Sequence, residues 1–176
     1  MKLQVAVNLV IILLVNIVLA GSESQTASSS KTSAPIVDSA FRKKWLSAEG
    51  YRKSADEGFA GAQYNLGVCY FSGEGVETNL TESVKWFRKA AEQGLAIAQY
   101  NLGLCYVKGY GVEKDKVEGL AWLTLAATFE NNDYKAERDK VEQQLDKDSV
   151  LRAKERAKKW AQQIEQGKAK GGKEKK

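Results

Sequence analysis

QYNLGVCY at residues 63–70 returns as QYNLGLCY at residues 99–106, and each copy is followed by the pattern GxGVE. The similarity extends over the whole segments 54–89 and 90–125, in which 17 of 36 aligned positions are identical. Unrelated sequences would share only about two such positions. A self-similarity of this length and period indicates that one supersecondary unit is present in tandem copies.

The repeated unit is predicted to consist of two antiparallel helices. In the first helix, small and apolar residues recur at i, i+4, i+7 and i+8, which places them on one stripe: Ala62, Leu66, Cys69 and Tyr70. Gly67 is small enough to let a neighbouring helix approach closely. Gly73 and Gly75 then end the helix, because glycine supplies the backbone angles that a reversal needs.

The second helix is predicted to start near Asn79 or Thr81, and near Asp115 in the next copy. Asn79 and Asp115 are equivalent positions, and both side chains can accept a hydrogen bond from the first free amides of a helix. The apolar stripe of this helix comprises Val84, Phe87 and Ala91, with Trp86 and Ala90 beside it. Gly94 is predicted to end the copy.

This pattern resembles the Sel1-like repeat, a relative of the tetratricopeptide repeat. The resemblance rests on AxAQYNLGxCYxxGxGV followed by WxxxAAEQG, and it covers roughly residues 46–127, including a partial leading copy whose second helix includes residues 51–58. It implies an all-α fold, a short right-handed solenoid of stacked helix pairs whose concave side holds a protein or peptide partner. It implies no catalytic step.

The repeats are predicted to occupy residues 41–130, and capping helices residues 131–166. In the last helix, apolar residues form a narrow seam that can close the open end of the stack: Val150, Ala153, Ala157, Trp160 and Ile164. Residues 167–176 are predicted to form a disordered basic tail, since this Lys- and Gly-rich segment cannot fold alone.

The N-terminus carries a separate signal. Residues 3–20 are almost entirely apolar after a short basic start, and small residues surround Ala20. This arrangement predicts an export signal cleaved after Ala20, or alternatively an uncleaved anchor, because 18 residues approach the length of a spanning helix. Residues 21–40 are predicted to be a flexible Ser/Thr-rich linker. Either reading places the repeats outside the cytoplasm, in the periplasm or secreted, and the second leaves them anchored by residues 3–20.

Charge is concentrated at the C-terminus. Residues 151–176 hold ten Lys or Arg and three Glu, whereas the whole chain has a net charge of only +5. Such a segment can keep the protein soluble or make weak contact with anionic surfaces. We expect no nucleic-acid partner, because no aromatic stacking platform lies among these lysines.

The composition argues against catalysis. The chain has no His, which removes His-based nucleophile systems, the usual zinc ligand sets and the commonest acid/base group at neutral pH. We therefore expect no catalytic residue, cofactor or metal. Cys69 and Cys105 occupy equivalent positions one repeat apart, too far for a disulfide between them, so both are predicted to be buried apolar fillers.

The candidate partner-binding residues lie between the stripe positions of the two first helices: Tyr64, Asn65, Val68, Phe71, Tyr100, Asn101, Leu104 and Lys108. Tyrosine and asparagine side by side suit peptide binding, since the ring supplies apolar area and the amide can pair with a peptide backbone. The competing interpretation is that Tyr64 and Tyr100 only pack between repeats. The predicted function is an exported, non-enzymatic adaptor. The alternative is a protein that binds or hydrolyses cell-wall peptides or β-lactams, as resemblance to cysteine-rich relatives implies.

Overall fold

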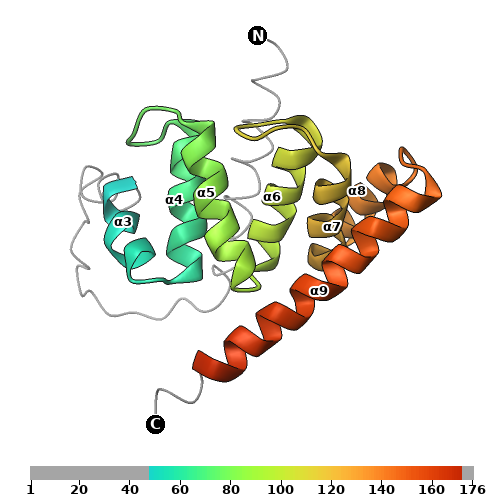
Figure 1. Cartoon of the computed structure of the whole chain (residues 1–176). Helices are drawn as coiled ribbons and strands as arrows, with labels where there is room; N and C mark the ends of the chain where they lie inside the picture. Colours follow the sequence, from blue (N-terminus) through green and yellow to red (C-terminus); the bar gives the residue numbers. More distant parts are fainter. Residues whose placement is uncertain (1–47, 172–176) are drawn as a thin grey trace, which may run out of the picture. The chain divides into compact units, whose positions relative to one another are not determined.

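The computed structural model describes residues 48–171, and the side chains of residues 48–167. Within these limits the chain forms seven α-helices and no strand (Figure 1): α3 (Ala48–Asp56), α4 (Ala60–Ser72), α5 (Leu80–Glu92), α6 (Ala96–Lys108), α7 (Lys116–Ala126), α8 (Asn132–Glu142) and α9 (Lys147–Gly171). The predicted export signal or anchor, the linker, residues 41–47 and residues 172–176 lie outside the described residues.

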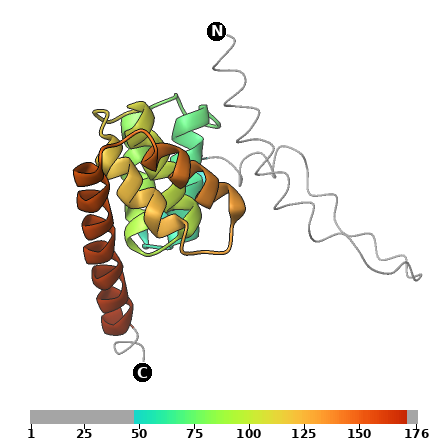
Figure 2. The same ribbon diagram turned by 90° about the vertical axis from the view of Figure 1, so that its right-hand side faces the viewer.

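Consecutive helices pack side by side, from α3 on α4 through to α7 on α8 (Figures 1 and 2). The helices α4 and α5 form one hairpin and α6 and α7 form the next, so each copy of the sequence repeat supplies one pair. The last helix departs from this order, because α9 returns to pack against α7. The all-α solenoid that the repeat predicts is therefore confirmed.

The helix ends fall where the sequence indicates. Gly73 and Gly109 follow α4 and α6 in the left-handed conformation, with φ of 78° and 77°, and each donates its amide to the cysteine carbonyl one turn back. Asn79 accepts a hydrogen bond from the amide of Glu82 at the start of α5, and Asp115 accepts two at the start of α7. The same turn and the same cap therefore recur in both copies.

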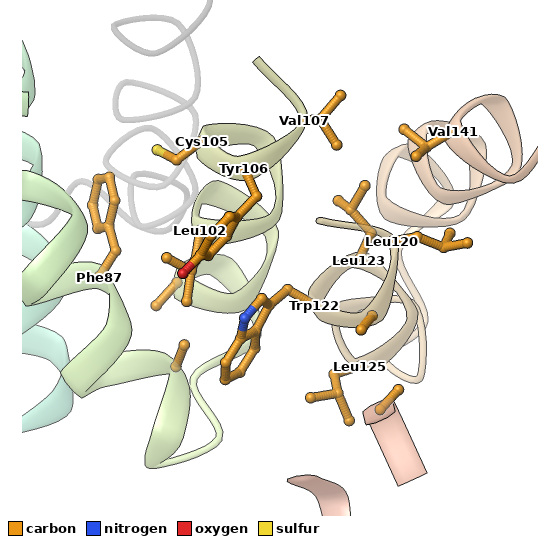
Figure 3. Close-up of a cluster of buried hydrophobic side chains, with 14 of the residues drawn as sticks. Phe87, Leu102, Cys105, Tyr106, Val107, Leu120, Trp122, Leu123, Leu125 and Val141 are labelled. Atoms are coloured by element: carbon orange, nitrogen blue, oxygen red, sulfur yellow. The ribbon is translucent and has the colours of Figure 1, made fainter. Parts of the chain in front are cut away.

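Two apolar clusters fill the interior. The larger one joins α5, α6, α7, α8 and α9, and Figure 3 shows Phe87 of α5 on one side of it, Leu102 of α6 in the middle and Val141 of α8 on the other. The smaller cluster joins α3, α4 and α5 around Leu66 and Trp86. Cys69 and Cys105 are both buried, as predicted, and lie in different clusters.

Close helix contacts depend on glycine. A methyl group on Gly67 would lie 2.7 Å from the Phe87 ring, and one on Gly119 would lie 2.9 Å from the carbonyl oxygen of Gly103. Ser83, which occupies the position of Gly119 in the preceding copy, donates its hydroxyl to the carbonyl of Gly67 at 2.8 Å. One copy thus joins its two helices by a hydrogen bond, and the other by direct backbone contact.

The seam of α9 closes the end of the stack. Ala153 and Ala157 are buried, whereas Val150, Trp160 and Ile164 are half-buried against the larger cluster. The Trp160 ring stacks on Trp122 of α7, with centroids 4.1 Å apart. Beside the seam, the Arg156 guanidinium pairs with Glu118 of α7 at 2.5 Å.

One boundary differs from the sequence prediction. The basic segment expected to be disordered from residue 167 is helical as far as Gly171, because α9 continues through it. Gln166, Lys168, Ala169 and Lys170 are good helix formers, and a single glycine at position 167 costs about 1 kcal/mol, which a long preceding helix tolerates. Only residues 172–176 of that tail lie beyond the described part.

Candidate partner-binding face

The eight predicted partner-binding residues are divided equally between α4 and α6, the first helices of the two copies. Lys108 is exposed, and the other seven are half-buried. A half-buried side chain both packs on the protein and presents part of its surface outward. The contacts of Tyr64 and Tyr100 show how both side chains pack, while partner binding by them stays a prediction.

Tyr64 connects the two copies. Its ring stacks on Phe87 with centroids 5.7 Å apart, and its hydroxyl accepts a hydrogen bond of 3.3 Å from the Asn101 amide on α6. Burial raises the pKa of Tyr64 to about 12, although the Asn101 hydrogen bond acts in the opposite direction. Tyr64 is thus neutral at physiological pH and is held in place from both sides.

Tyr100 occupies the position of Tyr64 in the next copy, and its ring is also stacked on an aromatic side chain. Its ring stacks on Tyr134 of α8, with centroids 4.7 Å apart and planes inclined by 25°. Burial raises the pKa of Tyr100 to about 12, and the nearby negative charges of Glu137 and Asp133 act in the same direction. We refer to Tyr64, Tyr100 and Tyr134 as the tyrosine row, since they come from α4, α6 and α8.

Four other predicted residues lie on the same two helices, α4 and α6. Phe71, at the end of α4, meets the Tyr110 ring edge-on at a centroid distance of 6.0 Å. Val68 packs against the larger cluster from its margin. Leu104 occupies the position of Val68 in the next copy and is also half-buried, while Lys108 in the last turn of α6 is exposed.

Tyr134 and Tyr110 were not predicted from the sequence. Both lie outside the block of identical residues, and the connection between α7 and α8 changes the spacing, so no repeat offset points to Tyr134. One pair of equivalent contacts could have been found from the repeat in the sequence. Arg52 donates to the Tyr70 hydroxyl at 2.6 Å, and Arg88 donates to the Tyr106 hydroxyl. The two pairs are related by the same offset of 36 residues.

Two hollows of the described surface lie away from the predicted partner-binding residues. The first, of about 520 Å³, is lined by residues of α3 and by Glu57, and the second, of about 610 Å³, by residues around the α6–α7 turn and by Leu145. Neither includes any of the eight predicted residues. His, Cys, Asp and Glu side chains form no group of three or more that could hold a metal ion in the part of the chain that the structure describes. Between residues 48 and 171, no helix combines the length and the hydropathy that a membrane span requires.

Comparison with known proteins agrees with this architecture. The sequence model of the Sel1 repeat matches residues 60–95 and 96–128. Each matched repeat thus begins at a first helix, six residues after the start of the corresponding copy in the sequence analysis. Among curated proteins, no sequence matches this chain.

Two solved structures are similar. A protective antigen present in uropathogenic Escherichia coli strains, which displays an SLR fold, is 36% identical with a TM-score of 0.65 over 70% of this chain and 26% of its own. A Sel1 repeat protein from Oxalobacter formigenes is 43% identical with a TM-score of 0.50 over 52% of this chain and 37% of its own. The present chain therefore spans about a quarter of the first relative and somewhat more than a third of the second.

Proposed function

Because residues 60–95 and 96–128 are two Sel1 repeats, we propose that this protein is a non-enzymatic adaptor that holds a protein or peptide partner on the first helices of its repeats. Sel1 repeats are generally protein-interaction scaffolds and not catalytic units. The comparisons give no support to the alternative of a β-lactam- or cell-wall-peptide-binding protein.

The observation that carries the proposal is the tyrosine row. Three helices that are separate in sequence each contribute one tyrosine, and the rings and amides between them are half-buried. Their packing contacts fix the orientation of these side chains before any partner arrives, which lowers the entropic cost of binding. Tyrosine combines a large apolar ring with a polar group and is enriched at interfaces for that reason.

A blocking experiment tests the proposal without disturbing the packed tyrosines. Asn65→Arg together with Leu104→Arg places two bulky cations on the predicted face, at half-buried positions of α4 and α6. Thr81→Arg together with Gln162→Arg adds the same charge at exposed positions of α5 and α9 and serves as the matched control. Peptides selected from a displayed 12-residue library on the wild-type protein should bind the control with unchanged affinity and lose at least about tenfold on the blocked variant.

The proposal fails if the selected peptides bind the blocked variant as tightly as the control. It also fails if the library yields no peptide that binds in a saturable way. Circular dichroism melting curves of both variants verify that the introduced arginines have left the fold intact, so that a loss of affinity reports on the face itself.

The proposed location is outside the cytoplasm. It rests on the sequence of residues 1–20, in which an apolar run follows a short basic start. Cell fractionation followed by mass determination should find the protein in the extracytoplasmic fraction, starting at Gly21 if the signal is cleaved or at Met1 if it remains as an anchor. Replacing Leu13 and Leu14 by Arg should retain the chain in the cytoplasm, and an unchanged distribution would contradict the proposal.

A weak contact of the C-terminal region with anionic surfaces is also part of the proposal. Lys158 and Lys159 are exposed on α9, and five further lysines follow them in the chain. Co-sedimentation with vesicles rich in phosphatidylglycerol should fall when NaCl is raised from about 50 to 500 mM, because salt screens exposed charges. Sedimentation that is independent of salt would contradict an electrostatic contact.

A further inference from the structure

Charge is distributed unevenly around the tyrosine row. The helix α4 contains no charged residue, and α6 contains only Lys108, in its last turn. Lys108 lies eight positions after Tyr100, which corresponds to about 12 Å along a helix. The helix α8, where Tyr134 is located, carries both acidic and basic residues.

Two carboxylates of α8 lie close to Tyr100. Asp133 precedes Tyr134 in the chain, and Glu137 follows it by three positions, which is almost one helical turn. The negative charges of both carboxylates raise the pKa of the nearby Tyr100 hydroxyl. Arg138 lies one turn after Tyr134 on α8, and its guanidinium is paired with Asp139 at 2.7 Å. Glu137 has one ion-pair partner, Lys140, at a distance of 3.5 Å, and the Lys140 side chain is 63% exposed. Such a long, exposed pair is weak and is easily exchanged for another cation.

The α6–α8 corner of the row therefore offers two kinds of interaction to a cation. The stacked rings of Tyr100 and Tyr134 supply neutral phenol groups with negative ring faces, and Asp133 and Glu137 supply negative charge beside them. Arginine fits this combination best, because its planar guanidinium both stacks on aromatic rings and donates to carboxylates; lysine fits as a point charge.

Building on the proposed function, we propose that the corner formed by Tyr100, Tyr134, Asp133 and Glu137 receives an arginine or lysine side chain of the bound partner. The partner is thus a protein or peptide with a basic residue at the position that meets the α6–α8 corner. The opposite end of the row, next to uncharged α4, accepts apolar or polar residues.

A comparison of two peptides tests this assignment. The strongest binder from the 12-residue library is labelled with fluorescein, and a second peptide carries citrulline in place of its arginine, which preserves shape and removes charge. By fluorescence anisotropy, the arginine peptide should bind the wild-type protein at least about tenfold more tightly than the citrulline peptide. This comparison requires no substitution in the protein, so it does not depend on the folding of any variant.

A protein variant then locates the effect. Asp133→Asn with Glu137→Gln should reduce the difference between the two peptides to less than about twofold. Asp56→Asn with Glu155→Gln removes the same charge from exposed positions of α3 and α9, on helices other than the three that carry the tyrosine row, so this control should retain the full difference.

The possible results separate the two proposals. If the peptides bind and the blocked variant loses them, but the arginine and citrulline peptides bind equally, the basic-residue assignment is overturned and the adaptor function stands. The assignment is also overturned if the selected peptides lack basic residues, or if the control pair reduces the difference as much as the α8 pair. If no peptide binds, the proposed function fails and this assignment fails with it.

Discussion

The contact between α6 and α7 predicts a large effect of one added methyl group. In Gly119→Ala, the new Cβ would lie 2.6 Å from a Val107 methyl carbon, 2.9 Å from the Gly103 carbonyl oxygen and 3.1 Å from the Val107 amide nitrogen. Two of these three atoms belong to the backbone of α6. Since a backbone cannot rotate away as a flexible side chain does, α6 and α7 must separate.

The expected magnitude follows from two opposing terms. Overpacking a well-packed core costs about 1–3 kcal/mol, while replacing glycine by alanine inside a helix returns about 1 kcal/mol. Because the added methyl group meets backbone atoms, the overpacking cost of Gly119→Ala should lie in the upper part of that range. The net loss of unfolding free energy is then about 1–2 kcal/mol. For a domain of this size, the melting temperature should fall by about 4–8 °C.

The matched substitution is Gly61→Ala in α4. An added Cβ at Gly61 would meet no atom within 4 Å, so only the helix-propensity gain remains, about 0.5 kcal/mol in the first turn. Thermal melting followed by circular dichroism should therefore order the three proteins with Gly61→Ala highest, wild type next and Gly119→Ala lowest. The reasoning is refuted if Gly119→Ala melts at or above the wild-type temperature.

Three further predictions follow from other contacts. Replacing Asn79 or Asp115 by Ala removes the side-chain cap of α5 or α7 and should cost about 1 kcal/mol each in urea unfolding; no change in the urea midpoint would contradict the capping role. Trp160→Ala removes the ring stacked on Trp122 and should lower the free energy of unfolding by about 2–3 kcal/mol. The fluorescence emission of the remaining tryptophans should shift to the red. An unshifted spectrum with unchanged stability would show that α9 does not close the stack. Burial raises the pKa of Tyr64, Tyr100 and Cys105 to about 12, from ordinary values of 10.0 for tyrosine and 9.0 for cysteine. Because the unfolded chain loses these protons at lower pH than the folded chain, the free energy of unfolding should decline as pH rises from about 9 to 12. Equal urea midpoints at pH 8 and pH 11 would exclude this coupling.

Much of the fold was predictable because the sequence contains two copies of one unit, which can be compared position by position. Asn79 and Asp115 differ in identity and agree in capping ability, which marked both helix starts, and the glycines after α4 and α6 marked both turns. The end of α9 was not predictable in this way. Residues 167–171 have no counterpart in the repeat, and whether they continue the helix depends on the length of the helix that precedes them.

The candidate site was predictable only in part. The repeat pointed to Tyr64 and Tyr100, but it contained no signal for Tyr134, because α8 lies beyond the second copy. Tyr134 joins the candidate site only because α8 packs beside α7, which places the Tyr134 ring on the Tyr100 ring. The acidic neighbours of Tyr100 are likewise more than thirty positions away in sequence.

The sequence by itself determined the all-α architecture, the repeat length, the turns and the caps, because these depend on interactions among residues that are close in the chain. Tertiary structure alone decided which side chains of different helices meet: the tyrosine row, the carboxylates at its α8 end, and the backbone contact between Gly103 and Gly119. The physical reason is that local hydrogen bonding fixes helices and turns, whereas contacts between helices depend on how their surfaces fit together.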